Sequence, residues 1–210
     1  MREKLVGFYN YTVLLTYLGV GVAIAGIGFA LMGRTSVAIL CLMAAGLCDM
    51  FDGRIAKRRT RTRDEQLFGI QIDSLSDLIC FGALPAVIGY SLGLTTWYGT
   101  VTLAVYVLAA LIRLAYYNVT EEAFSDAGTH RVYYDGLPVT ACALLIPLLY
   151  TLRPLLKGDF RYVYMAWLLV LAGAYIIKVR VRKPGLIGMV CTLFIAMAVL
   201  AGVIAGWNQY

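Results

Sequence analysis

Residues 49–56 read Asp-Met-Phe-Asp-Gly-Arg-Ile-Ala, and residues 69–77 read Gly-Ile-Gln-Ile-Asp-Ser-Leu-Ser-Asp. These two segments hold four of the twelve acidic residues, although 61% of the 210 residues are hydrophobic and only 14% are charged. Both segments lie beside or inside long apolar runs. An ionised carboxylate at membrane depth is costly, so acids in such a place indicate a functional site.

The apolar runs that surround these acids fall at residues 13–32, 36–51, 78–93, 97–117, 137–152, 162–177 and 186–206. Several reach the ~20 residues that a helix needs to cross a hydrocarbon core, where helices satisfy their own backbone hydrogen bonds. The runs at 36–51 and 137–152 are short and cross only if they include polar flanking residues. We therefore predict an all-α fold, a polytopic transmembrane helical bundle of about seven spans (six to eight). We expect a single membrane domain over residues 1–210.

The basic residues are distributed unevenly between the connecting loops. Alternate loops, counted from the N-terminus, hold Arg2, Lys4, Arg54, Lys57, Arg58, Arg59, Arg61, Arg63, Arg131, Lys178, Arg180, Arg182 and Lys183. The opposite loops hold only Arg34, Arg153, Lys157 and Arg161. Because Lys and Arg favour cytoplasmic loops, we predict a multi-pass protein of the cell membrane whose N-terminus and carboxylates face the cytoplasm.

The formal net charge of +6 is then mainly a topology signal, and anionic membrane lipids are its natural partner. Nucleic acid is not an expected partner, because no soluble basic domain is present to bind it. The five cysteines are scattered singly through apolar runs and form no C-x-x-C pair. This pattern predicts neither a zinc site nor a disulfide framework.

The spacing of the four acids predicts a shared site. Asp49 and Asp52 are three residues apart, and Asp73 and Asp77 are four apart, so each pair shares one helix face. Two antiparallel helices joined on the cytoplasmic side bring the pairs together. Oxygen ligands of this kind select Mg²⁺, Mn²⁺ or Ca²⁺, and two such ions would neutralise four carboxylates. Ordinary salt bridges with the neighbouring basic residues are the alternative, but they do not require this spacing.

The pattern Asp-x-x-Asp-Gly-x-x-Ala…Gly-x-x-x-Asp-x-x-x-Asp over residues 49–77 resembles the signature of the CDP-alcohol phosphatidyltransferase family. Lys57 stands where that family usually has Arg. Residues 68–86, the Arg-Leu-Ala-Tyr-Tyr-Asn stretch at 113–118 and the Gly-Leu-Pro stretch at 136–138 resemble the phosphatidylserine synthase branch. The resemblance implies transfer of the phosphatidyl group of CDP-diacylglycerol to the hydroxyl of L-serine, with release of CMP. Other branches use glycerol 3-phosphate, inositol or inositol phosphate as the acceptor.

The resemblance also implies roles for individual residues and a homodimer. The implied ligands of Mg²⁺ or Mn²⁺, with two ions expected, are Asp49, Asp52, Asp73 and Asp77, the last being also the general base. The implied nucleotide-binding residues are Asn10, Thr12, Asp49, Gly53 and Ala56. Candidates for binding the diphosphate or serine are Arg54, Arg58, Arg113 and Asn118.

Alternatives stay open for several of these residues. Asn10 and Thr12 could instead cap the first helix, since both residue types favour that position. Arg113 lies within a span and could snorkel towards the interface or pair with an acid. A divalent-cation transporter with an intramembrane Asp cluster is the rival from another functional class, and it predicts ion flux without nucleotide binding.

Overall fold

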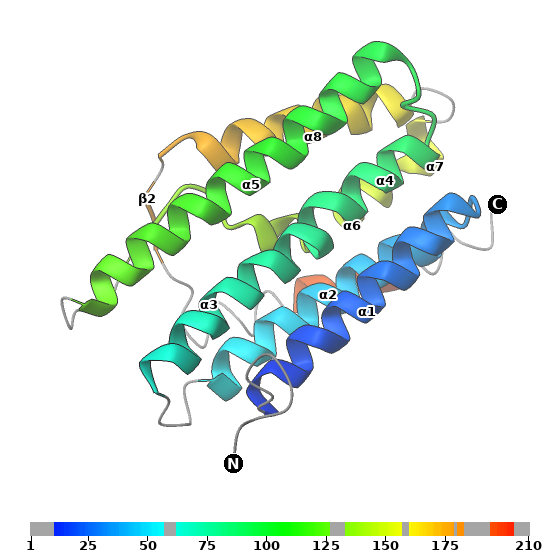
Figure 1. Cartoon of the computed structure of the whole chain (residues 1–210). Helices are drawn as coiled ribbons and strands as arrows, with labels where there is room; N and C mark the ends of the chain where they lie inside the picture. Colours follow the sequence, from blue (N-terminus) through cyan, green and yellow to red (C-terminus); the bar gives the residue numbers. More distant parts are fainter. Residues whose placement is uncertain are drawn as a thin grey trace.

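The computed structural model describes residues 11–56, 62–126, 133–156, 160–178, 180–182 and 194–203, without the side chains at 11–12, 52–56, 121–126, 133–135 and 180–182. The described chain is mainly helical, and its longer helices run side by side (Figure 1). The elements are α1 (Tyr11–Leu31), α2 (Thr35–Ala56), α3 (Arg63–Asp77), η1 (Leu78–Ala83), α4 (Leu84–Ser91), α5 (Trp97–Asp126), β1 (Tyr133–Asp135), η2 (Val139–Ala141), α6 (Cys142–Tyr150), α7 (Arg153–Leu156), α8 (Phe160–Ile176) and β2 (Arg180–Arg182). A further helix spans Phe194–Val203.

Within the described residues, three helices are long and apolar enough to cross a membrane: Val13–Leu31, Arg63–Ser91 and Trp97–Thr120. Four shorter apolar helices are found at Thr35–Phe51, Val139–Tyr150, Phe160–Ile176 and Phe194–Val203. Together they follow the order of the predicted apolar runs. The prediction of a mainly helical chain with helices long and apolar enough to span a membrane is therefore confirmed, while the number of helices that cross stays a prediction.

Two helices extend beyond the predicted apolar runs. The helix that contains the run at 78–93 begins already at Arg63, because Thr62 caps it. The Thr62 hydroxyl oxygen accepts from the Glu65 N–H at 3.3 Å, and the Glu65 carboxylate accepts from the Thr62 N–H at 3.0 Å, which is a capping box. The helix α5 continues to Asp126, well beyond the predicted end of its apolar run at residue 117.

The expectation of a purely helical chain missed one small element. The strands β1 and β2 pair antiparallel, with Tyr133 opposite Arg182 and Asp135 opposite Arg180. The helices α5 and α8 pack against each other, which brings the segments that follow them together. The turn after β1 is docked on α8, because Gly136 has a φ of +88° and the Leu137 N–H donates to the Ala174 carbonyl at 3.2 Å.

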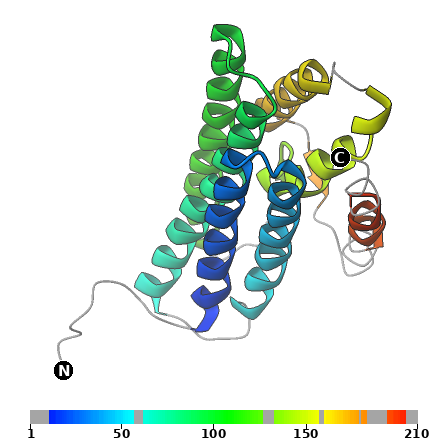
Figure 2. The same ribbon diagram turned by 90° about the vertical axis from the view of Figure 1, so that its right-hand side faces the viewer.

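The helix α1 lies between α2 and the continuous helix formed by α3, η1 and α4 (Figure 2). Small residues allow this close packing: a Cβ at Gly26 would lie 2.8 Å from the Cys41 Cβ, and one at Gly19 would lie 3.4 Å from the Cys48 Cβ. The start of α1, the end of α2 and the start of α3 lie at one end of the bundle. We call this the carboxylate end.

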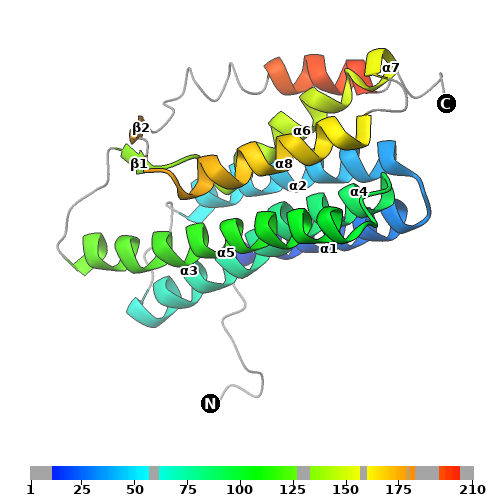
Figure 3. The same cartoon turned by 90° about the horizontal axis from the view of Figure 1, so that it is seen from above.

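The opposite end carries the α1–α2 and α4–α5 turns, in which Gly33 and Gly93 have φ values of +76° and +101°. We call it the far end. Seen from above, α6 and α8 lie along the side of α2 and α5 (Figure 3). The turns at Gly33 and Gly93 therefore lie at the end of the bundle opposite the carboxylates. Which end faces the cytoplasm stays a prediction.

Candidate active site

Three carboxylates meet at the carboxylate end. One oxygen each from Asp49, Asp73 and Asp77 lies within 4.8 Å of the others, and all three residues are half-buried. Asp49 comes from α2, whereas Asp73 and Asp77 come from successive turns of one face of α3. The backbone of Asp52 continues α2 one turn further, but its side chain lies outside the described part of the chain.

The charge of this cluster favours a divalent cation. Two carboxylates 4.8 Å apart repel each other by roughly 3–4 kcal/mol at an effective dielectric constant of ~20, and three of them repel more. A cation held between them converts this repulsion into attraction. Because the donors are all carboxylate oxygens, they fit a hard ion such as Mg²⁺ or Mn²⁺.

The cavity beneath the carboxylates has walls from three helices. Besides the three acids, it is lined by Thr16 and Gly19 of α1, Ala45 and Cys48 of α2, and Ser76, Cys80 and Phe81 of the continuous helix. Its volume is about 10 Å³, which suits one water molecule or one ion. A larger ligand therefore has to extend beyond this cavity.

Sequence reasoning named Thr12 at the start of α1 but missed Thr16 and Gly19, which line this cavity. Thr16 is 8% exposed and lies one helical turn beyond Thr12, so the spacing of four residues was the available signal. Ser76, 6% exposed, lies in the signature itself, but its hydroxyl donates to the Ile72 carbonyl of its own helix at 2.7 Å. Thr16 and Ser76 are therefore both additions to the predicted site.

The structure places Asn118 against α3. Its side-chain oxygen accepts from the Ser74 hydroxyl at 2.6 Å, and its side-chain N–H donates to the Gln71 side-chain oxygen at 3.4 Å. Ser74 is the neighbour of Asp73. Asn118 thus joins α5 to the helix that carries two of the three clustered acids, a contact that its predicted role in substrate binding did not include.

Arg113 lies deeper in the same helix and is only 5% exposed. Its guanidinium carbon lies 5.8 Å from the centre of the Tyr117 ring. A Cβ added at Gly136 would come 3.5 Å from the Arg113 Nε and 3.1 Å from the Ile177 carbonyl. Two stretches singled out in the sequence, at 113–118 and 136–138, are therefore brought together by the fold.

The other predicted site residues are not described at side-chain level. Asn10 and Arg58 lie outside the described residues. For five others the structure describes the backbone, as part of α1 or α2, but not the side chain: Thr12, Asp52, Gly53, Arg54 and Ala56. Their roles stay predictions.

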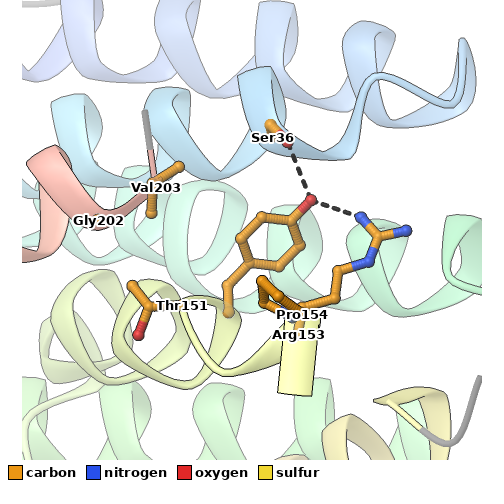
Figure 4. Close-up of a pocket in the computed structure, with 7 residues that line it drawn as sticks. Ser36, Thr151, Arg153, Pro154, Gly202 and Val203 are labelled. Atoms are coloured by element: carbon orange, nitrogen blue, oxygen red, sulfur yellow. Dashed lines mark hydrogen bonds between the residues drawn. The ribbon is translucent and has the colours of Figure 1, made fainter. Parts of the chain in front are cut away.

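A second small cavity, of about 20 Å³, lies at the far end (Figure 4). The Tyr150 hydroxyl receives a hydrogen bond from the Arg153 guanidinium at 2.6 Å and lies 3.0 Å from the Ser36 hydroxyl. Arg153 also lies over the Tyr150 ring, 5.4 Å from its centre. These contacts tie α2 to α6 and α7.

The sequence matches the CDP-alcohol phosphatidyltransferase family over residues 9–177. The chain belongs to this family. Members of the CDP-alcohol phosphatidyltransferase family use a divalent metal, and the cluster of Asp49, Asp73 and Asp77 is compatible with one. Membership in this family favours a phosphatidyltransferase over the cation transporter that the acids alone also allowed.

Three individual proteins show which members of the family this chain is similar to. The chain is 39% identical over 112 residues to a CDP-diacylglycerol–serine O-phosphatidyltransferase of Saccharomyces cerevisiae, covering 51% of the chain and 40% of the relative. It is 32% identical over 132 residues to the protein of that name from Mycobacterium bovis, covering 62% and 45%. It is 28% identical over 188 residues to an archaetidylserine synthase of Methanothermobacter thermautotrophicus, covering 89% and 75%. The chain thus spans less than half of the yeast and mycobacterial proteins.

Proposed function

We propose that this protein transfers the phosphatidyl group of CDP-diacylglycerol to the hydroxyl of L-serine and releases CMP. The observation that carries the proposal is the convergence of Asp49, Asp73 and Asp77 within 4.8 Å, inside the family's signature. The choice of serine is supported by the names of the yeast and mycobacterial relatives and by the archaeal one, which is also a serine-lipid synthase.

In this proposal the clustered acids hold two Mg²⁺ or Mn²⁺ ions together with Asp52. When bound, the ions polarise the phosphoryl oxygens and stabilise the charge on departing CMP. Asn10, Thr12, Gly53 and Ala56, with Asp49, surround the cytidine nucleotide. Arg54 and Arg58 lie on the next residues of the signature and offer positive charge to the diphosphate.

Asp77 accepts the proton of the serine hydroxyl. As that oxygen forms its bond to the phosphorus of the phosphatidyl group, the bond between the phosphorus and the CMP oxygen breaks. A serine hydroxyl is a poor nucleophile, so a carboxylate within hydrogen-bond reach speeds the attack. Asp77 is well suited, because it lies one turn from Asp73 and at the edge of the same small cavity.

Arg113 holds the serine carboxylate in this proposal. Its planar guanidinium suits two parallel hydrogen bonds to a carboxylate. Its burial and its position beside Gly136 support a fixed orientation. Asn118 lies a turn and a half further along α5 and contributes to the serine site through its contact with Ser74.

We further propose that all seven apolar helices cross the cell membrane, that the carboxylate end faces the cytoplasm, and that the chain forms a homodimer. Single cysteines introduced at positions 61 and 182 should then react with an impermeant reagent from the cytoplasmic side, and one at 157 from the opposite side. Labelling of position 61 from outside would invert the orientation. Cross-linking in membranes tests the dimer.

The deciding experiment uses purified protein, CDP-diacylglycerol, Mn²⁺ or Mg²⁺ and a panel of acceptors, with CMP release as the readout. We expect release with L-serine and little with glycerol 3-phosphate, inositol or inositol phosphate. Release with one of these acceptors instead would keep the chemistry and change the substrate. If none of the acceptors in the panel supports CMP release, the proposal is overturned.

A further inference from the structure

The helix that carries Asp73 and Asp77 contains a break in its hydrogen bonding just after these acids. In an α-helix the carbonyl of Phe81 would accept from the N–H of residue 85, but residue 85 is proline, which has no N–H and whose ring crowds that carbonyl. The chain stays helical by adopting a π-helix over Leu78–Ala83, in which the Leu84 N–H donates to the Ile79 carbonyl five residues back. The Phe81 carbonyl is left for other donors.

Those donors come from other helices. The Tyr106 hydroxyl of α5 donates to the Phe81 carbonyl at 2.7 Å, and the Cys142 thiol of α6 donates to it at 3.6 Å. Tyr106 and Cys142 are both 0% exposed. The Tyr106 hydroxyl also lies 3.4 Å from the Tyr175 hydroxyl of α8. Side chains of two helices therefore donate to one backbone carbonyl that the proline cannot serve, and a third helix contacts one of these donors.

This carbonyl lies one turn beyond Asp77. Phe81 itself lines the cavity beneath the carboxylates, and further along the helix Leu84 and Ile88 are completely buried in the core. The additional residue in the π-helical turn rotates the helix segment before it by ~100° relative to the segment after it. Because the core fixes α4, the π-helical turn decides the direction in which Asp77 points.

We propose that Tyr106 is a positioning residue for the carboxylate cluster: its hydroxyl, by holding the Phe81 carbonyl, fixes the π-helical turn and thereby aims Asp77 at Asp49 and Asp73. Tyr106 touches neither substrate nor metal in this role. The inference rests on the proposed function for its effect on turnover, but its effect on cation binding is independent of the acceptor alcohol.

Tyr164 provides a matched control. It too is 0% exposed, and its hydroxyl donates at 2.8 Å to a carbonyl of the same helix, that of Pro85. That carbonyl lies within α4, where the regular α-helical pattern offers it a backbone N–H as well. Loss of the Tyr164 hydroxyl therefore removes a buried hydrogen bond without releasing the π-helical turn.

The experiment compares Tyr106→Phe with Tyr164→Phe in the full chain in detergent, measuring the melting temperature, Mn²⁺ affinity by electron paramagnetic resonance, and CMP release. We expect similar falls in melting temperature for both. Only Tyr106→Phe should weaken Mn²⁺ binding and lower kcat, each by about tenfold or more, because small displacements of a reacting group carry large penalties. The KM for serine should stay near the wild-type value.

Wild-type Mn²⁺ affinity and kcat in Tyr106→Phe would reduce Tyr106 to a structural residue and overturn the proposal. Equal losses in Tyr164→Phe would overturn it too, because they would indicate general loosening. If Tyr106→Phe is not recovered folded, Cys142→Ala removes the weaker donor to the same carbonyl and leaves the Tyr106 hydroxyl in place. Its Mn²⁺ affinity should stay near the wild-type value, whereas a loss of about tenfold or more would assign control of the turn to Cys142 and overturn the proposal. A wild-type protein that binds Mn²⁺ but releases no CMP would reject the proposed reaction, while the Mn²⁺ comparison would still decide the role of Tyr106.

Discussion

The two ends of the bundle treat charge in opposite ways. At the far end, the guanidinium of Arg153 lies over the Tyr150 ring and donates a hydrogen bond to the Tyr150 hydroxyl. The same hydroxyl also contacts the Ser36 hydroxyl. At the carboxylate end, three acids of like charge are gathered within 4.8 Å. The cavities at the two ends are both small, at about 20 and 10 Å³, so the two ends do not differ by the size of their cavities. The contacts of Arg153 join three helices, whereas the gathering of like charges at the carboxylate end is compatible with a bound cation.

The largest expected effect is on the carboxylate end. Asp49→Asn or Asp73→Asn should lower CMP release by at least ~10²–10³-fold, because an amide cannot offset cationic charge as a carboxylate does. Without metal, the melting temperature should hold or rise, since one member of a repelling cluster is neutralised. Arg153→Gln at the far end is the control and should keep its turnover. Near-normal release at saturating Mn²⁺ would remove the substituted acid from the ligand set.

Asp77→Asn separates proton abstraction from metal binding. If Asp77 is the base, turnover should fall by ~10²–10⁴-fold while CDP-diacylglycerol still binds with metal, because the other acids remain. Isothermal titration beside single-turnover CMP release measures the two effects. A collapse of nucleotide affinity along with the rate would make Asp77 chiefly a metal ligand. A wild-type rate would leave it no role in the chemistry.

A smaller effect tests the contact between α3 and α5. Ser74→Ala and Asn118→Ala should each reduce turnover, and the double variant should lose less than the two effects combined, with a coupling of about 1 kcal/mol. The reason is that both substitutions break the same 2.6 Å hydrogen bond. If Asn118 acts mainly by binding substrate, its substitution should reduce turnover equally with and without Ser74.

The smallest effect on turnover is expected at the far end. Tyr150→Phe removes the hydroxyl shared by Arg153 and Ser36, so the free energy of unfolding should fall by about 1–2 kcal/mol while CMP release stays unchanged. Thermal unfolding in detergent measures the first quantity. Tyr162→Phe is the control, because the Tyr162 hydroxyl accepts from Arg161 at an exposed site, and it should cost less. A loss of turnover in Tyr150→Phe would mean that the two ends are coupled.

The sequence by itself determined the helical class, the order of the apolar helices and the spacing that places Asp73 and Asp77 on one helix face. These features depend on local rules: hydrophobic length, and a helical period of 3.6 residues. The capping box of Thr62 and Glu65 was also present in the sequence, and reading it would have placed the start of α3 correctly.

Only the tertiary structure decided which helices face one another. It placed α1 beside the carboxylates, so that Thr16 joined the cavity, and it turned Asn118 towards Ser74. It also paired β1 with β2, and it supplied the Phe81 carbonyl with the hydroxyl of Tyr106, a residue 25 positions away. Periodicity fixes the face of a helix on which a side chain lies. The partner across that face depends on packing between segments distant in sequence, which no local pattern encodes.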